Sequence, residues 1–266
     1  MAGDFYESDR AVAEYLLFHY GSAEQVMPWS SGPLNAVNFA ARCVSECLNP
    51  EGLPENARAL DLGCAVGRST FELAQHCAEV IGVDSSEKFI ETARELLDQG
   101  SVQFSYVEEG ELKIPGTARV PGGVERQRVR FERADAADLP KDLGEFHVVL
   151  MANLIDRLQD PKRCLKQLPG LVKPGGQLIL TSPYTWLTEY TPRRNWLGGF
   201  EKGGKRIKTL DTLKTLLGED FDLVETRNLP FLLREHSRKF QWSMAEASLW
   251  RRKGGGESAP VSTPGE

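Results

Sequence analysis

The stretch ALDLGCAVGRST, residues 59–70, decides the fold. It predicts a buried strand whose end carries Asp61, a turn containing Gly63 and Gly67, and a helix that begins near Ser69. Glycine suits a turn that must bend sharply and let the backbone approach a ligand without a Cβ in the way. The amide groups at the start of the following helix favour an anionic or electron-rich group. This stretch therefore predicts a ligand-binding turn at the carboxyl end of a strand.

Short apolar runs and helical segments alternate after this turn, a pattern typical of a parallel sheet with helices on both faces. We expect an α/β, Rossmann-like sheet of about seven strands, mostly parallel, with an antiparallel last pair. The expected strands are residues 59–62, 80–84, 129–134, 146–151, 177–181, 221–233 and 240–251. The expected helices are residues 4–20, 34–47, 69–77, 87–97 and 162–168.

The organisation expected from these elements is one domain over residues 1–253. Within it, residues 1–50 form an N-terminal helical lid. Residues 105–127 form an insertion rich in Gly, Glu and Pro, either a flap or an edge hairpin. Residues 254–266 have little to bury and are expected to be a disordered tail.

Composition excludes several classes of protein. The 266 residues are 41% hydrophobic and 26% charged, the usual balance of a globular chain. No apolar run approaches the roughly 20 residues that span a bilayer, and the start of the chain is acidic, unlike a signal peptide. We therefore expect a cytoplasmic protein with no membrane partner.

Charge and cysteine usage narrow the partners further. The net charge is −6, and the basic cluster at residues 202–208 is interpreted as a solvated loop, so no nucleic-acid partner is expected. The five cysteines include no CxxC pair, and the four histidines stand far apart. Neither a metal site nor a disulfide framework is indicated.

Further motifs distinguish the turn from a nicotinamide site. The G-x-G-x-x-G fingerprint fails because Ala65 and Arg68 occupy its second and third glycine positions. Asp84 ends the second strand, 17 positions after Gly67 (84 − 67), where a carboxylate can accept hydrogen bonds from both ribose hydroxyls. The segment ADAADLP places Asp135 at the end of the next strand, and LVKPGGQLIL, residues 171–180, precedes and forms the fifth.

These four elements in this order resemble the class I S-adenosylmethionine-dependent methyltransferases, with Ala65 where glycine is frequent. The resemblance implies S-adenosylmethionine as the cofactor, with Asp135 and the Ala136 amide reading the adenine edge. Asn153 is a candidate contact of the methionine part. The implied cofactor-binding residues are Asp61, Gly63, Cys64, Gly67, Asp84, Ser85, Asp135, Ala136 and Asn153.

Four other stretches bear on the acceptor: FYESDRAVAEYLLFHYG (5–21), MANLIDRL (151–158), TSPYTWLTEYTP (181–192) and PFLLREHSRKFQW (230–242). Together they resemble the C-terminal 4-mercaptohistidine N1-methyltransferase domain of ovothiol synthases. The resemblance implies methyl transfer to an imidazole nitrogen of 4-mercaptohistidine (5-thiohistidine), the last step of ovothiol A biosynthesis. Because that domain is usually fused to a sulfoxide synthase, it also implies such an enzyme as a pathway partner.

Such a reaction needs a positioned nitrogen with a free lone pair and a partner that holds the imidazole tautomer. The candidate catalytic residues are Asn153, Asp156, Tyr184 and His236. Candidates for binding the substrate's carboxylate, ammonium and ring are Arg10, Tyr15, His19, Trp186, Arg234, Glu235 and Arg238. Each has a structural alternative: Tyr15, His19 and Trp186 can pack in a core, and Asp156 can cap a helix or pair with Arg157.

Two alternative functions stay open at this point. One is methyl transfer to another small thiol, imidazole or amino acid. The other is a non-catalytic cofactor-binding partner of a sulfoxide synthase.

Overall fold

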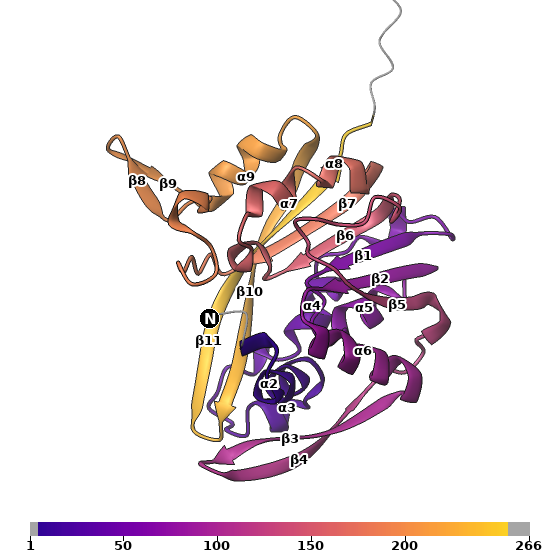
Figure 1. The fold of residues 1–266 in the computed structure, drawn as a ribbon, viewed down its shortest axis with the longest axis vertical. Helices are drawn as coiled ribbons and strands as arrows, with labels where there is room; N and C mark the ends of the chain where they lie inside the picture. Colours follow the sequence, from indigo (N-terminus) through magenta and orange to yellow (C-terminus); the bar gives the residue numbers. More distant parts are fainter. Residues whose placement is uncertain (1–4, 255–266) are drawn as a thin grey trace, which may run out of the picture.

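Seven strands form the main sheet of the computed structural model, which describes residues 5–254 (Figure 1). The strand order is β10-β11-β7-β6-β1-β2-β5. The strands are β1 (Arg58–Leu62), β2 (Glu79–Asp84), β5 (Val129–Arg133), β6 (Phe146–Ala152), β7 (Val172–Ser182), β10 (Phe221–His236) and β11 (Lys239–Arg252). Strands β7, β6, β1, β2 and β5 are parallel neighbours, and β11 runs antiparallel to both β7 and β10. This confirms the predicted fold class and its antiparallel last pair.

Alternation along the strands builds one apolar core on each face of the sheet. In β1, Ala59 packs in the cluster that contains Phe71 and Phe89, whereas Leu60 packs in the cluster that contains Leu168. Successive side chains of a strand point to opposite faces, so both faces of a central strand must be apolar. Because the five strands are parallel, their carboxyl ends meet at one edge of the sheet, where the predicted turn lies.

Helices cover both faces (Figure 1). Helices α4 (Phe39–Ser45), α5 (Arg68–Leu73) and α6 (Glu87–Gln99) lie on one face, and α7 (Pro161–Leu165), α8 (Leu168–Leu171) and α9 (Thr209–Leu217) lie on the other. The N-terminal part contributes α2 (Asp9–Tyr20) and α3 (Ala23–Val26). Short 3-10 helices occupy Leu34–Ala36, Pro50–Gly52, Arg126–Arg128, Ile155–Arg157 and Arg193–Asn195.

The structure corrects several predicted elements. The helix expected at 34–47 is two pieces, because Asn38 adopts a left-handed conformation with φ 57° between them. The helix expected from residue 4 is α2, which begins at Asp9 after Ser8 caps it by accepting a hydrogen bond from the Ala11 amide (3.1 Å); residue 4 lies outside the described residues. The helix expected at 162–168 is divided between α7 and α8.

Helices α3 and α9 were not predicted from the sequence. The hairpin of β8 (Phe200–Lys202) and β9 (Lys205–Ile207) was not predicted either. This hairpin contains the basic cluster predicted to be a loop, and its lysines are exposed as expected.

The insertion is a hairpin of β3 (Ser101–Glu109) and β4 (Leu112–Arg119), so it begins earlier than the predicted residue 105. It forms a separate two-stranded sheet and does not extend the edge of the main sheet. The Ser237 amide, in the turn between β10 and β11, donates to the Glu108 carbonyl at 3.0 Å. The hairpin therefore lies beside α2 and the end of β10 (Figure 1). Apart from Gly254, the predicted disordered tail lies outside the described residues.

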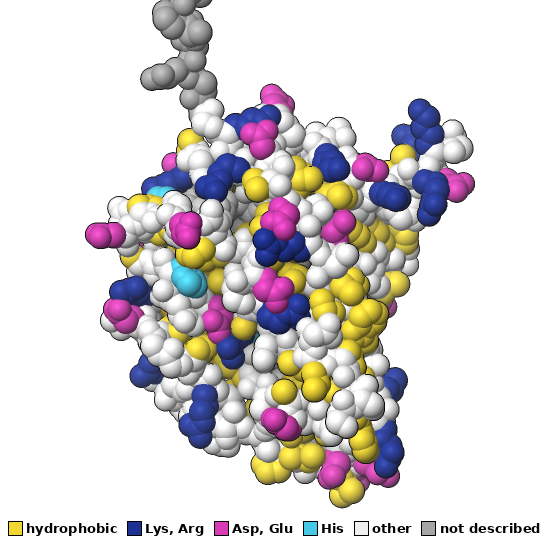
Figure 2. Space-filling model, turned by 180° about the vertical axis from the view of Figure 1, so that it is seen from behind, with side chains coloured by type: hydrophobic (Ala, Val, Ile, Leu, Met, Phe, Trp, Pro, Cys, Tyr) yellow, Lys and Arg dark blue, Asp and Glu magenta, His cyan; other side chains and the backbone are white. Residues whose placement is uncertain are grey.

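The surface shown in Figure 2 carries Lys and Arg side chains interspersed with Asp and Glu. No helix within residues 5–254 is long and apolar enough to cross a membrane.

Candidate functional site

A cavity of about 570 Å³ lies at the carboxyl ends of the parallel strands. Open α/β sheets bind ligands at this edge, and the volume falls within the roughly 300–1,000 Å³ typical of ligand pockets. The turn after β1, the end of β2, the segment after β6 and helix α2 all contribute to its wall. Its lining includes Tyr6, Tyr15, Phe18, His19, Phe39, Gly63, Ala65, Asp84, Ser85, Phe89, Asn153, Arg157, Glu189, Tyr190 and Phe231.

The turn between β1 and α5 has no room for larger residues. Gly63 has φ 74°, and a Cβ there would lie 2.8 Å from Cδ1 of Leu154. Gly67 has φ 86°, and a Cβ there would lie 2.5 Å from Cζ of Phe131. Positive φ and close packing both select glycine. The backbone at Gly63 is consequently exposed to the cavity, as the sequence predicts for a ligand-binding turn.

Asp61 stabilises this turn through hydrogen bonds on the side away from the cavity. The hydroxyls of Ser69 and Thr70 each donate to its Oδ2 at 2.7 Å, which ties the end of β1 to the first turn of α5. Its Oδ1 has no partner among the described residues, and burial raises the pKa of Asp61 to about 6. The side chain is fully buried and does not line the cavity.

Asp84 ends β2 and lines the cavity with Ser85. Its Oδ2 accepts a hydrogen bond from the Ala65 amide at 3.0 Å, and its Oδ1 accepts one from the Ser86 amide at 2.9 Å. A carboxylate has about four acceptor sites, so each oxygen keeps a lone pair for a hydroxyl of a ligand. Burial raises the pKa of Asp84, while the two amide donors oppose that rise.

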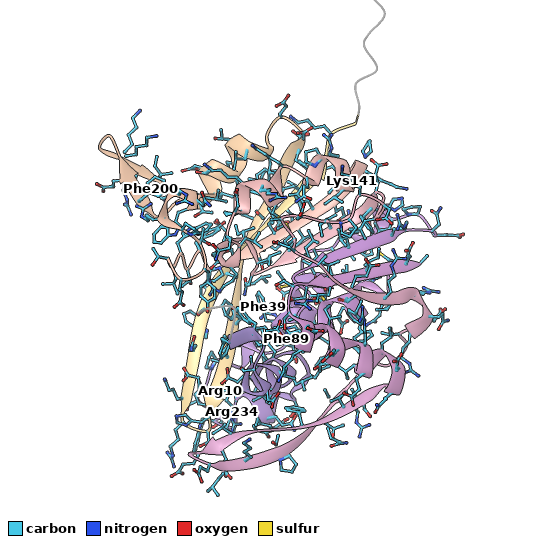
Figure 3. The ribbon with its side chains drawn as sticks, in the orientation of Figure 1. Arg10, Phe39, Phe89, Lys141, Phe200 and Arg234 are labelled. Carbon is cyan, nitrogen blue, oxygen red and sulfur yellow. The ribbon has the colours of Figure 1, made fainter. Side chains whose placement is uncertain are left out.

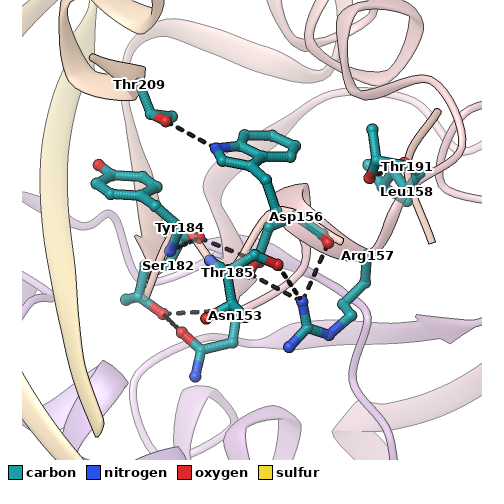
Figure 4. A network of polar contacts seen from close by, with 11 residues as sticks. Asn153, Asp156, Arg157, Leu158, Ser182, Tyr184, Thr185, Thr191 and Thr209 are labelled. Carbon is teal, nitrogen blue, oxygen red and sulfur yellow. Dashed lines mark hydrogen bonds and ion pairs between the residues drawn. The ribbon is translucent and has the colours of Figure 1, made fainter. Parts of the chain in front are cut away.

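Asn153 is the third polar group at this edge. It has φ 52°, and its amide N–H donates to the Thr181 carbonyl at 2.9 Å. The Thr181 hydroxyl donates to its Oδ1 at 3.0 Å (Figure 4). The strained backbone is held by these contacts, a combination common at functional sites. The side-chain amide nitrogen has no partner among the described residues and is free to donate to a ligand.

Helix α2 covers the opposite side of the cavity. Tyr15 and His19 line it, as predicted, and the Nδ1 of His19 has no partner among the described residues. Burial lowers the pKa of His19 to about 3, so the imidazole is neutral at physiological pH. This neutral ring can exchange hydrogen bonds with a ligand without carrying charge.

Sequence reasoning missed Tyr6, Arg157, Glu189 and Tyr190. The guanidinium carbon of Arg157 lies 4.8 Å from the centre of the Tyr190 ring, and the Tyr6 ring centre is 6.1 Å from that of Tyr190. These residues fall inside three of the four stretches quoted for the acceptor, but no periodicity shows which loop side chains point inward.

The part of the chain that forms this edge of the sheet matches a known family of domains. Residues 60–180 match the methyltransferase domain family. This range includes the turn after β1, Asp84 and Asn153.

The chain is 29% identical over 123 residues to a ubiquinone biosynthesis O-methyltransferase of Coxiella burnetii, covering 46% of this chain and 42% of that protein. It is 25% identical over 207 residues to the enzyme of the same name from Leptothrix cholodnii, covering 74% of this chain and 77% of that protein. The chain thus spans less than half the length of the Coxiella relative.

Solved structures share the fold of this chain. A SAM-dependent methyltransferase from Methanosarcina mazei superposes with a TM-score of 0.51 at 19% identity, covering 78% of this chain and 99% of that one. The cyclase SpnF superposes with a TM-score of 0.57 at 15% identity, covering 96% of each chain. The domain match and the shared fold imply S-adenosylmethionine as the cofactor.

The cavity fits this cofactor. Asp84 offers two acceptor oxygens for a ribose, the Gly63 turn allows close approach of the backbone, and the Asn153 amide offers a donor. Cys64, Gly67, Asp135 and Ala136 do not line the cavity. Cys64 is buried, and Asp135 accepts a hydrogen bond from the Ala137 amide at 2.8 Å in the turn after β5.

Asp156 does not line the cavity. It accepts hydrogen bonds from the Ser182 hydroxyl at 3.0 Å and the Thr185 amide at 2.9 Å, and it pairs with Nη1 of Arg157 at 3.0 Å (Figure 4). Its side chain is fully buried. The structure therefore favours the pairing alternative: Asp156 positions Arg157, which does line the cavity.

Tyr184 and Trp186 also lie away from the cavity. The Tyr184 hydroxyl donates to Glu246 at 2.8 Å, and the Trp186 indole N–H donates to the Thr209 hydroxyl at 2.9 Å. Trp186 stacks on Trp196 in the core of the other sheet face. Trp186 thus has the packing role of its structural alternative, and Tyr184 is tied to β11 through Glu246.

The remaining substrate candidates do not line the cofactor cavity. His236 ends β10, and Arg238 lies in the turn between β10 and β11, where its guanidinium lies over the Trp29 ring at 5.5 Å. Arg10, Arg234 and Glu235 are brought together, but around a second cavity. Arg10 is at the start of α2, and the long β10 carries the others past the cofactor cavity.

Proposed function

We propose that this methyltransferase transfers a methyl group from S-adenosylmethionine to an imidazole nitrogen of 4-mercaptohistidine, giving ovothiol A. One observation carries the proposal. Apart from Asp84, two charged side chains line the cavity within the described residues. They are the guanidinium of Arg157 and the carboxylate of Glu189. They stand among the aromatic rings of Tyr6, Tyr15 and Tyr190. This set matches an amino acid with a flat ring, which brings one carboxylate, one ammonium and one aromatic face.

Arg157 is prepared for the acceptor's carboxylate. Its Nη1 is engaged by Asp156 and by the Thr185 carbonyl at 3.1 Å, which fixes the guanidinium plane. The other terminal nitrogen keeps its donors for a ligand. Glu189 can take the ammonium. A charged hydrogen bond of this kind is worth about 1.5–3 kcal/mol.

The chain's own residues do the work of positioning. Bound S-adenosylmethionine supplies an activated methyl group. Asp84 and Asn153 hold the cofactor end of the cavity, and the aromatic wall excludes water and orients the acceptor ring. Alignment of the attacking nitrogen with the bond that breaks is the main catalytic requirement of such a displacement. His19 lines the cavity as a neutral ring and can hold the imidazole in one tautomer.

The low-identity relatives favour a second candidate, O-methylation of a phenolic ring. The apolar wall of Phe18, Phe39 and Phe231 would accept such a ring. A phenol must lose its proton to attack, and the low pKa of His19 makes it a weak base. The free donors of Arg157 and the carboxylate of Glu189 would then face a substrate without charged groups, so the amino-acid acceptor is the better fit.

The test compares acceptors with the full chain and S-adenosylmethionine. Four acceptors are incubated in parallel: 4-mercaptohistidine, 4-mercaptoimidazole, histidine and a catechol. Methylated products are quantified by mass spectrometry. We expect 4-mercaptohistidine to react at least tenfold faster than the others. Faster methylation of the catechol or of histidine would overturn the proposal, and so would no product from 4-mercaptohistidine.

A variant links this result to the cavity. Arg157→Met should raise the KM for 4-mercaptohistidine roughly tenfold or more, as loss of a charged hydrogen bond predicts, and leave that for 4-mercaptoimidazole unchanged. Arg163→Met, which removes an exposed arginine paired with Asp138 outside the cavity, is the matched control. Equal effects of both variants would contradict the assignment of Arg157.

A further inference from the structure

A second cavity of about 690 Å³ lies on the other side of helix α2. Tyr15 and His19 of α2 face the cofactor cavity, whereas Val12, Leu16 and Leu17 line the second one. The remaining walls are α6, the β3–β4 hairpin and the end of β10. Figure 3 shows Arg10 and Arg234 together at this end of β10, apart from Phe39 and Phe89, which line the cofactor cavity.

Arg234 is the unusual group in this second cavity. It is only 7% exposed, and its Nε has no hydrogen-bond partner among the described residues. Its Nη1 donates to the Gln25 carbonyl, and its guanidinium carbon lies 5.1 Å from the centre of the Tyr106 ring. No described carboxylate lies within ion-pair distance of it. Buried charges in proteins are normally paired, and Arg234 has no described ion pair.

Most of the other charged side chains that line the second cavity form ion pairs with one another or with neighbours. Arg10 pairs with Glu14 at 2.7 Å, and Lys88 pairs with Asp9. Glu235 pairs with Lys239 at 2.7 Å. Lys113, Glu91 and Glu95 line the cavity without a described ion pair, and all three are exposed. Arg234 is the buried charge of this cavity that has no described ion pair.

The body of the wall is apolar and aromatic. Leu16, Leu17, Val102, Phe104 and Tyr106 line it. A ligand that suits this wall and Arg234 together has an anionic group on a small apolar or aromatic body.

We propose that this second cavity binds a small organic carboxylate, with the carboxylate on Arg234 and the body against Phe104 and Tyr106. This site is separate from the proposed acceptor site, and its test does not depend on methyl transfer. A planar guanidinium is the side chain best matched to a carboxylate, because it offers two parallel donors.

The test uses two probes with the same ring and opposite charge, phenylacetate and phenethylamine. Each is titrated into the full chain by calorimetry. We expect saturable binding of phenylacetate and none of phenethylamine. Arg234→Met should weaken phenylacetate binding at least tenfold, whereas Arg157→Met, in the cofactor cavity, should leave it unchanged. Absence of saturable phenylacetate binding, equal binding of the amine, or an unchanged affinity in Arg234→Met would overturn the proposal.

A second measurement requires no variant. Phenylacetate added to the isotope-labelled wild-type chain should shift the backbone amide NMR signals of Phe104 and Tyr106 and leave those of Asp84 and Asn153 in place. Shifts confined to Asp84 and Asn153 would place the probe in the cofactor cavity and overturn the proposal, even if Arg234→Met failed to fold.

Discussion

Replacement of Asp84 by asparagine should weaken S-adenosylmethionine binding roughly 100-fold. In the wild type, Oδ2 accepts from the Ala65 amide and Oδ1 from the Ser86 amide, at 3.0 and 2.9 Å, and each oxygen keeps a lone pair for one ribose hydroxyl. Asparagine retains one acceptor oxygen and turns an NH2 group toward the other amide. The variant therefore loses one charged hydrogen bond to the ribose, weakens the second and opposes two donors. With charged hydrogen bonds worth about 1.5–3 kcal/mol each, the net loss is about 3 kcal/mol.

The assay is calorimetric titration of S-adenosylmethionine into both proteins, with thermal unfolding to show that each is folded. Asp138→Asn is the control, because Asp138 is exposed and its side chain pairs only with Arg163 among the described residues. The control should bind within about twofold of the wild type. Binding by Asp84→Asn within threefold of the wild type would refute the assignment of Asp84 as the ribose acceptor.

Three further results follow from the same geometry. Gly67→Ala should lower the free energy of unfolding by about 2–4 kcal/mol, since it adds a clash with Phe131 to the cost of a positive φ. The control Gly110→Ala, at φ 56° in open space, should lower it by only about 1 kcal/mol. Equal losses of the two variants in urea unfolding would contradict this. Because the folded-state pKa of Asp61 is raised from 3.8 to about 6, its ionisation costs stability as the pH rises through 6. The free energy of unfolding of Asp61→Asn, measured relative to the wild type, should therefore rise by roughly 2–3 kcal/mol between pH 4 and pH 7. A difference between the two proteins that does not change with pH would refute this. Glu189→Gln should raise the KM for 4-mercaptohistidine about tenfold, as loss of one charged hydrogen bond predicts; steady-state kinetics with an unchanged KM would remove Glu189 from the acceptor site.

The fold was predictable because its signals are local. Apolar runs such as 146–151 must be buried on both faces, which identifies parallel strands, and the glycines of the first turn are required by their own backbone conformation. Asp84 was predictable for the same reason: a residue that ends a parallel strand lies at the ligand-binding edge whatever the loops do.

The acceptor side was less predictable, because it depends on where loop side chains point. Asp156 follows β6, yet Ser182 at the end of β7 and Thr185 just after it hold its carboxylate away from the cavity. His236 was misplaced by distance. Leu233 lines the cavity, and three further residues of β10 carry the chain roughly 10 Å beyond it, at about 3.3 Å per residue.

The cavity residues that were not predicted from the sequence also depend on tertiary structure for their positions. Tyr6 precedes α2, and Tyr190 lies in the long segment between β7 and β8. Neither segment has a period that distinguishes inward from outward side chains. Their meeting at the cavity is a tertiary event that only the assembled sheet and α2 determine.

The most direct test of the central claim is to follow a carbon-13 label. The full chain is incubated with 4-mercaptohistidine and S-adenosylmethionine that carries carbon-13 in its methyl group, and the product is examined by heteronuclear NMR. The account predicts a labelled methyl group on an imidazole nitrogen and its correlations to the ring. A label on the thiol sulfur, or no labelled product from a chain that binds the cofactor, would contradict it.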